Sequence, residues 1–333
     1  MRVSWRGAIG LALTVFLLWL ALHNVSWSDV RADLRAANVP LVIIAVVLAT
    51  MVFPLRAIRW RPILHPVAPN LPYGPLWRAT AIGFMANNIL PARAGELVRA
   101  YVLSRETSVT FSAAFASLVV DRVFDGVIVI LLMVLAMFDP RLPADTMVAG
   151  RPASNYAGSG IVVLLVVAAA LYAIVFFPGR LIRIYELFAR RVAPRFEEPG
   201  KALLRSFADG LSVLRHPGRF LIVFGWALAM WLTQVVAFWI MFRALHIDAP
   251  FSAAMFVQGL IVLGVALPST PGFFGPFEIA AVAGLGVYGV SKNLAVAWAL
   301  SYHVLSLVPI TVIGLYYVAK SGLHLSQLRQ VRP

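Results

Sequence analysis

The stretch NNILPARAGELVRAYVLSRET, residues Asn87–Thr107, decides how this chain must fold. It lies between apolar stretches that are long enough to enter a lipid bilayer, yet it carries Arg93, Glu96 and Arg99. Pro91 lacks a backbone donor and clashes with the preceding turn, so a continuous helix is not expected through it. Charge beside a broken helix inside a membrane is costly and usually functional. The segment therefore points to a functional site as well as to a fold.

The composition of the chain explains the apolar flanks. Of the 333 residues, 61% are hydrophobic and only 13% are charged, and the mean hydropathy is +0.86. A soluble domain has roughly 45–50% apolar and about 25% charged residues. Uncharged runs approach or exceed the roughly 20 residues that cross about 30 Å of hydrocarbon as a helix, and they are too long for barrel strands of about ten residues. We therefore predict an all-α polytopic membrane protein.

The charged residues and the missing cysteines exclude several classes of function. The net charge of +14 comes from 28 basic and 14 acidic residues, which in a membrane protein hold loops in the cytoplasm rather than bind nucleic acid. The absence of cysteine excludes disulfides, thiolate metal sites and cysteine nucleophiles. No histidine pair has metal-site spacing, and no P-loop, nucleophile elbow or HExxH pattern occurs. We predict no metal, no cofactor and no catalytic site.

Hydropathy and basic residues together place six transmembrane helices. They are Gly7–His23, Pro40–Leu55, Phe111–Phe138, Gly160–Phe177, Phe220–Phe242 and Leu294–Ala319. No small-residue cleavage site follows the first run before Trp27, so it is read as a retained span. Basic residues such as Arg56, Arg59 and Arg61 gather on one side, and mixed loops lie on the other. The positive-inside rule then puts both termini in the cytoplasm.

Two further apolar stretches, Leu76–Tyr101 and Phe251–Val290, are each split near the middle by proline and glycine. If each were a full crossing, the charge pattern of the later loops would invert. We therefore predict two re-entrant hairpins, each made of two half-helices. The first hairpin would enter from the cytoplasm and the second from the opposite side.

The hairpins fall at matching places in two units. Repeat A covers about 40–138 and repeat B about 220–319, and they have opposite topology within one membrane domain, residues 1–333. Paired interrupted segments in inverted repeats are typical of transporters with a binding site between the repeats. Between them, about 179–219 is a cytoplasmic segment with nine basic and four acidic residues in 180–219. It is either one or two amphipathic helices on the inner leaflet or an ordinary basic linker.

The first hairpin supplies the clearest binding residues. The half-helix after the bend starts near Gly95, and a helix start favours an anion. Arg93 and Arg99 can grip a phosphate in bidentate fashion, and Asn87 and Asn88 can cap free carbonyls or meet a polar headgroup. The alternative is that both arginines are interfacial anchors and that Glu96 pairs with Arg99.

Three charged residues in the third span form a second constellation. Asp121 and Asp125 share a helix face, and Arg122 can pair with Asp125 at i+3. They form either a buried ion network that pins the span to the first hairpin or a proton relay. In the second hairpin Glu278 is either a favourable charge at a helix start or a group that titrates or meets a cationic headgroup.

The motifs resemble a known family. The run FMANNILPARAGELVRAYVLSRETSVTFSAAFASLVVDRVFDG (residues 84–126), LPSTPGFFGPFE (267–278) and RAIRWRPIL (56–64) look like those of the lysylphosphatidylglycerol synthase transmembrane region family. These are flippase-like integral membrane proteins, some fused to a soluble domain that performs aminoacyl transfer. Only 14 residues follow Ala319, so the resemblance implies lipid translocation rather than lipid synthesis.

The predicted function is a lipid flippase of the bacterial inner membrane that works by alternating access between the two hairpins. Its partner would be a membrane lipid with an anionic headgroup, such as a phospholipid, a hopanoid or a polyprenyl-linked lipid, and an oligomer is possible. One alternative is an integral membrane enzyme that uses Glu96, Asp121 or Glu278 as acid or base. Another is a non-transporting scaffold that recruits a lipid-modifying enzyme through residues 180–219.

Overall fold

The computed structural model describes residues 5–90, 94–142, 216–266 and 271–321, and parts of 143–215 (147–148, 151–152, 158, 161–163, 165–166, 169–170, 176–192, 194–198, 200–201 and 205). Its α-helices are α1 (Trp5–Leu22), α2 (Trp27–Ala36), α3 (Val39–Leu64), α4 (Tyr73–Ile89), α5 (Gly95–Glu106), α6 (Phe111–Met137), α8 (Pro178–Val192), α10 (Pro217–Ala244), α11 (Phe251–Val265), α12 (Pro276–Val287) and α13 (Lys292–Lys320). Two 3-10 turns, η1 (Pro194–Phe196) and η3 (Pro271–Phe273), are also described. The described strands, β1 (Met147–Val148) and β2 (Arg151–Pro152), form one antiparallel pair.

Three described helices, α3, α10 and α13, are long and apolar enough to cross a membrane. Helices α1 and α2 meet at a bend of 79°, and the pair qualifies as a fourth span if taken together. Helix α6 begins at the predicted residue, Phe111, but carries three charged side chains near its middle. The predicted fourth span, Gly160–Phe177, falls mostly outside the described residues. The chain is an all-α, multi-pass membrane protein, as its composition predicts.

Helix α3 is longer than the predicted second span. That span was expected to end at Leu55, with the following arginines in a loop, whereas α3 continues through Pro54 and Pro62 to Leu64. Arg56 and Arg59 therefore lie in the helix and are buried. The prediction was wrong because these side chains meet carboxylates inside the protein, so they need no water.

The first broken segment folds as two packed helices, α4 and α5, which pass each other at two glycines. A Cβ atom on Gly95 would lie 2.1 Å from the carbonyl oxygen of Gly83. Such close backbone contact between membrane helices requires residues without side chains. The second broken segment likewise folds as the packed pair α11 and α12.

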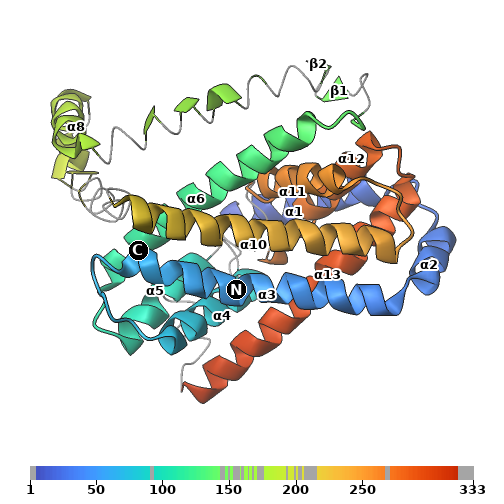
Figure 1. Ribbon diagram of the computed structural model, residues 1–333, viewed down its shortest axis with the longest axis horizontal. Coiled ribbons are helices and arrows are strands. Elements are labelled where there is room, and N and C mark those ends of the chain that lie inside the picture. Colours follow the sequence, from blue (N-terminus) through green and yellow to red (C-terminus); the bar gives the residue numbers. More distant parts are fainter. Residues whose placement is uncertain are drawn as a thin grey trace.

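Helices α3–α6 and α10–α13 pack in matching ways (Figure 1). Helix α3 contacts α4 and α6, and α5 lies between α4 and α6; α10, α11, α12 and α13 repeat this pattern. Across the two groups, α4 packs on α13 and α11 packs on α6. Helices α3 and α10 run antiparallel, since the Asn38 N–H at the start of α3 donates to the Ala244 carbonyl at the end of α10 at 2.8 Å.

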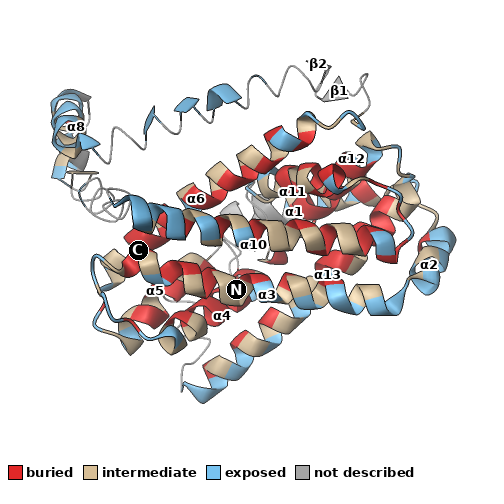
Figure 2. Ribbon diagram, in the orientation of Figure 1, coloured by how far each residue is buried: buried red, intermediate tan, exposed pale blue. Residues whose placement is uncertain are grey.

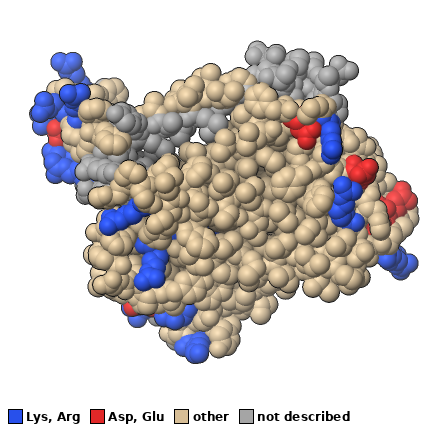
Figure 3. Space-filling model, viewed as in Figure 1, with Lys and Arg blue, Asp and Glu red and all other residues tan. Residues whose placement is uncertain are grey.

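Buried residues line the contacts between these helices, and apolar residues also cover the outside (Figure 2). On α3, Val39, Ile43, Val47 and Met51 recur every four residues and are all exposed. Figure 3 shows a wide band without Lys, Arg, Asp or Glu between two charged ends of the molecule. An apolar, uncharged band of this kind is the surface that lipid chains would cover.

Candidate functional site

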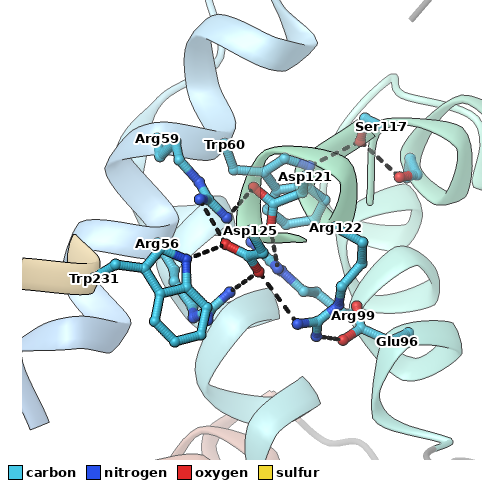
Figure 4. Close-up of polar contacts among 11 residues, drawn as sticks. Arg56, Arg59, Trp60, Glu96, Arg99, Ser117, Asp121, Arg122, Asp125 and Trp231 are labelled. Carbon is cyan, nitrogen blue, oxygen red and sulfur yellow. Dashed lines mark hydrogen bonds and ion pairs between the residues drawn. The ribbon is translucent and has the colours of Figure 1, made fainter. Parts of the chain in front are cut away.

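Two carboxylates on α6 form the centre of the candidate site (Figure 4). Asp121 and Asp125 are one turn apart and therefore share a face of the helix. Their exposed fractions are 1% and 5%, so both are removed from water. Buried carboxylates are tolerated only when they are paired and hydrogen-bonded. The partners come from α3, α5 and α10.

Arg59 of α3 bridges the two carboxylates. Its Nη2 lies 2.7 Å from Oδ1 of Asp121, and its Nη1 donates to Oδ1 of Asp125 at 2.7 Å. Arg56, three residues earlier on the same helix, donates to Oδ2 of Asp125 at 2.8 Å. The indole N–H of Trp231, from α10, donates to Oδ1 of Asp125 at 2.9 Å. The network thus joins α3, α6 and α10.

Arg99 of α5 adds the first hairpin to this network. Its Nη1 donates to Oδ2 of Asp121 at 3.3 Å, and its guanidinium carbon lies 4.0 Å from the ring centroid of Trp60. Trp60 is itself fixed, because its indole N–H donates to Oγ of Ser117 at 2.8 Å. Arg99 is 1% exposed, yet its Nε and Nη2 have no hydrogen-bond partner among the described residues.

The edge of the network is open to solvent. Arg122 of α6 lies 3.3 Å from Oδ2 of Asp125 and also forms an ion pair with Glu96 of α5. Its side chain is 45% exposed. Because the pair of Arg122 with Glu96 is neutral overall, it adds hydrogen bonds at the edge of the network but leaves the net charge of the buried part unchanged.

The buried part carries a surplus of positive charge. Three buried arginines, Arg56, Arg59 and Arg99, face two buried aspartates, and the ion pairs of these arginines within the described chain involve only those aspartates. One cationic charge is therefore uncompensated, and two buried N–H groups of Arg99 are free to donate. An anion is the ligand that such a site favours, since charge-assisted hydrogen bonds are the strong ones.

For Arg99, the structure decides whether the arginines of the first hairpin are interfacial anchors. Arg99 is buried, so it is not an interfacial anchor, and Glu96 pairs with Arg122 rather than with Arg99. The side-chain oxygen Oδ1 of Asn87 accepts the Gly95 N–H at 2.9 Å, which caps the start of α5. Asn87 thus caps the N–H end of the next helix, a role the sequence did not indicate.

Asn88 and Glu278 make their described polar contacts outside the network. Asn88 donates to the Thr311 hydroxyl of α13 at 2.8 Å. Glu278 accepts the Gly275 N–H at 2.7 Å at the start of α12 and meets His303 at 2.6 Å. Arg93 lies outside the described residues. The ion network joining α6 to the first hairpin is confirmed, including the i+3 pair of Arg122 with Asp125.

Sequence reasoning missed four members of the site: Arg56, Arg59, Trp60 and Trp231. Arg56 and Arg59 were assigned to a basic loop. Their i, i+3 spacing followed by a tryptophan is the signal that could have revealed them, because it places two guanidinium groups on one helix face. Within the described residues, no group of three or more His, Cys, Asp or Glu side chains could hold a metal ion.

The fold and this site define a class of protein: a multi-pass helical membrane protein with two broken helix pairs and a buried arginine–aspartate network. Residues 7–314 match the lysylphosphatidylglycerol synthase TM region, and the chain belongs to that family. A UPF0104 membrane protein of Methanothermobacter thermautotrophicus is 25% identical, with 97% of each chain covered. Another, from Methanocaldococcus jannaschii, is 22% identical with 96% of each covered.

One relative matches a shorter part of the chain at higher sequence identity. Glycosyltransferase AglD of Haloferax volcanii is 40% identical over 126 residues, which is 37% of this chain. The match spans only 20% of that protein, so its activity as a whole is not carried over.

Proposed function

We propose that this protein is a flippase that moves an anionic or modified lipid between the leaflets of the membrane. The observation that carries the proposal is the uncompensated positive charge of the buried network, with two donors of Arg99 unused. A headgroup phosphate would supply the missing charge and accept both donors. The uncharged band on the face shown in Figure 3 would let the acyl or polyprenyl chains stay in lipid.

The proposed topology has six transmembrane helices and two re-entrant hairpins, α4–α5 and α11–α12, in inverted repeats. The length of the half-helices supports it: α5 and α12 have 12 residues each, so at about 1.5 Å per residue they fall short of about 30 Å of hydrocarbon. In Figure 1 the two hairpins lie toward opposite ends of the antiparallel pair α3 and α10. Inverted repeats with broken helices are typical of transporters that alternate access around a fixed site.

The proposed orientation puts both termini in the cytoplasm. Lys and Arg dominate the end of the molecule that bears α8, whereas both signs occur at the end that bears α2 (Figure 3). The amphipathic helix α8 exposes Ile184, Leu187 and Phe188 among its arginines, which suits a helix lying on an anionic inner leaflet. Its Glu186 is paired with Lys201, and this hydrogen bond lowers the pKa of that carboxyl.

The charge of the site and the names of the relatives indicate which lipids are candidates for transport. A phospholipid, a hopanoid derivative or a polyprenyl-linked lipid would each present an acceptor to Arg99, and Arg93 at the hairpin bend would be a second ligand. One relative is named a glycosyltransferase, which adds lipid-linked sugars to the candidates. The membrane is proposed to be the plasma membrane; a bacterial inner membrane was predicted, and the relatives named above are archaeal.

The enzyme alternative has less support from the geometry. Asp121 is paired with two arginines and Glu96 with Arg122, so neither is placed as a free acid or base. The scaffold alternative, in which residues 180–219 recruit a lipid-modifying enzyme, rests on a segment that the structure describes only in part. Neither alternative uses the free donors of Arg99.

The test is leaflet-resolved lipid transport with Arg99→Gln. Purified protein is reconstituted into phosphatidylethanolamine vesicles with fluorescent phosphatidylglycerol or a fluorescent polyprenyl phosphate, and the outer-leaflet probe is quenched with dithionite. Arg105→Gln is the matched control, because Arg105 also lies on α5 but is exposed and bonds only to Tyr101 among the described contacts. We expect Arg99→Gln to slow transport at least about tenfold and the control to match the wild type.

The same variant separates function from folding. In Arg99→Gln, Asp121 keeps its contact with Arg59, and the buried part becomes neutral. The variant should therefore elute and melt like the wild type. The proposal is wrong if Arg99→Gln moves lipid at the wild-type rate, or if the wild type moves neither probe.

A further inference from the structure

We propose that Glu278 and His303 form a proton-binding site that couples lipid movement to a proton gradient. This inference rests on the proposed flippase function, but the proton site can be tested without it. It concerns the second hairpin, which the arginine network does not reach.

The two side chains are held together in a closed environment. Nδ1 of His303 lies 2.6 Å from Oε1 of Glu278, and Oε2 accepts the Gly275 N–H at 2.7 Å. Their exposed fractions are 0% for Glu278 and 3% for His303. The ring of Phe277 stacks on His303 at 4.1 Å between centroids, and Phe274 lies at 4.6 Å. Aromatic rings thus keep water away from the pair.

No fixed cation pairs with Glu278 in the described part of the chain, where its ion-pair partner is His303. Helix α11 carries no charged residue, and on α13 Lys292 is bound to the carbonyls of Leu20 and His23. Lys320 ends α13, Arg6 lies near the start of α1, and Arg78 of α4 pairs with Glu106. Three more elements pack against α13 and carry charged residues: α2 (Asp29, Arg31, Asp33 and Arg35), α3 (Arg56, Arg59 and Arg61) and α10 (Arg219 and Arg243). Of these, Arg56 and Arg59 pair with aspartates of α6, Arg243 pairs with Asp248, and Asp29 accepts from Asn293.

The charge of the pair therefore depends on one proton. With the proton on either group, the pair is neutral overall, as Glu⁻ with HisH⁺ or as GluH with His. Without it, a buried negative charge remains that no fixed cation among the described residues pairs with, which is costly inside a membrane. The pair should hold the proton while the aromatic rings enclose it, and release it to water when α12 moves and opens the site.

The backbone just before Glu278 has an unusual conformation and contacts the first hairpin. Gly272, Phe273 and Gly275 have φ values of 74°, 61° and 94°, a left-handed conformation that strains a non-glycine residue such as Phe273. This tip also reaches the first hairpin, since a Cβ on Gly272 would lie 3.7 Å from the carbonyl oxygen of Asn88. A change at the start of α12 would therefore be felt at the end of α4.

The position of the pair matches that of the arginine network. Arg99 and Asp121 join α5 to α6, and Glu278 and His303 join α12 to α13, the corresponding helices of the matching packing pattern. Arginine cannot lose its proton in a protein, whereas a Glu–His pair can. One hairpin thus supplies a fixed charge for the lipid and the other a charge that changes.

Proton binding is measured by NMR of protein labelled with ¹⁵N-histidine, in nanodiscs without added probe lipid, between pH 5 and pH 9. His303→Gln assigns the His303 signals. We expect these signals to titrate in the wild type and in the control Asp248→Asn, whose carboxylate is exposed, and to lose or change that titration in Glu278→Gln. Identical His303 signals in the wild type and Glu278→Gln, or no titration at all, would overturn the proton site.

Coupling is measured in the vesicle assay with a gradient of one pH unit in either direction. One coupled proton changes the inward-to-outward ratio by up to about tenfold per pH unit, and Glu278→Gln should move lipid with no such dependence. Wild-type transport that ignores the gradient would refute the coupling and leave the flippase function standing. If the wild type moves no lipid, the flippase function fails and the coupling with it, while the NMR result still judges the proton site.

Discussion

Replacing Asp125 by asparagine removes one negative charge from the most crowded point of the ion network. Asp125 meets Arg56 at 2.8 Å, Arg59 at 2.7 Å, Arg122 at 3.3 Å and the indole N–H of Trp231 at 2.9 Å. Asparagine keeps the shape of the side chain and one carbonyl oxygen for hydrogen bonding. The change therefore removes the charge and turns one acceptor oxygen into an NH2 donor that faces the N–H groups of its former partners.

The cost follows from what each arginine loses. Arg59 keeps its contact with Asp121, but Arg56, which is 6% exposed, loses the carboxylate with which it pairs in the described structure. Removing one partner of a buried ion pair destabilises a protein by about 3–5 kcal/mol. By contrast Asp248→Asn breaks an exposed pair with Arg243 and should cost about 0–1 kcal/mol.

The assay is reversible unfolding in mixed micelles with increasing dodecyl sulfate, followed by tryptophan fluorescence. The double variant Arg56→Met with Asp125→Asn removes both buried charges and should recover most of the lost stability, since replacing a buried pair by apolar groups is often neutral. The reasoning is refuted if Asp125→Asn stays within about 1 kcal/mol of the wild type. It is also refuted if the double variant is as unstable as the single one.

Three further predictions concern packing and the membrane surface. Gly95→Ala should cost about 1–3 kcal/mol because its Cβ would strike backbone, whereas Gly126→Ala, which meets nothing within 4 Å, should be neutral or slightly stabilising in the same unfolding assay. Asn88→Ala should lose about 1 kcal/mol with its bond to Thr311, and the double variant with Thr311→Val should cost little more. A peptide of residues 178–192 should bind anionic vesicles in co-sedimentation, and serine at Leu187 and Phe188 should abolish that binding; unchanged binding would contradict the surface role of α8.

The helix breaks could be predicted because proline and glycine act locally. The sequence around Pro91 predicts the end of α4 at Ile89 and the start of α5 at Gly95, and the run Pro268–Pro276 predicts the break between α11 and α12. The start of α6 at Phe111 was likewise predicted from the sequence alone. These features depend on residues within one or two turns of each other.

The members of the site on α3 could not be predicted in the same way. Whether Arg56 and Arg59 are buried or exposed depends on Asp121 and Asp125, which lie more than sixty residues later in the chain. The positive-inside rule treats a basic residue after an apolar run as a loop residue, because it counts charges without their partners. The alternative in which Glu96 pairs with its i+3 neighbour Arg99 fails for the same reason, since Arg99 pairs with Asp121 and Glu96 with Arg122.

The two hairpins are held to the rest of the protein by different forces, and this bears on which of them moves. Lipid gives half-helices no hydrophobic reason to associate, so close packing and polar links decide how firmly each is fixed. Arg99 ties α5 to Asp121, which Arg59 ties to α3, so this hairpin is held by a network of several buried ion pairs. Helix α12 is tied to α13 by the ion pair of Glu278 with His303, beside the stacking of Phe277 on the same histidine. If lipid moves by a rearrangement of the hairpins, binding or release of one proton therefore changes the free energy of the second hairpin more than that of the first. Labels on α12 should then move further than labels on α5 when the pH is stepped.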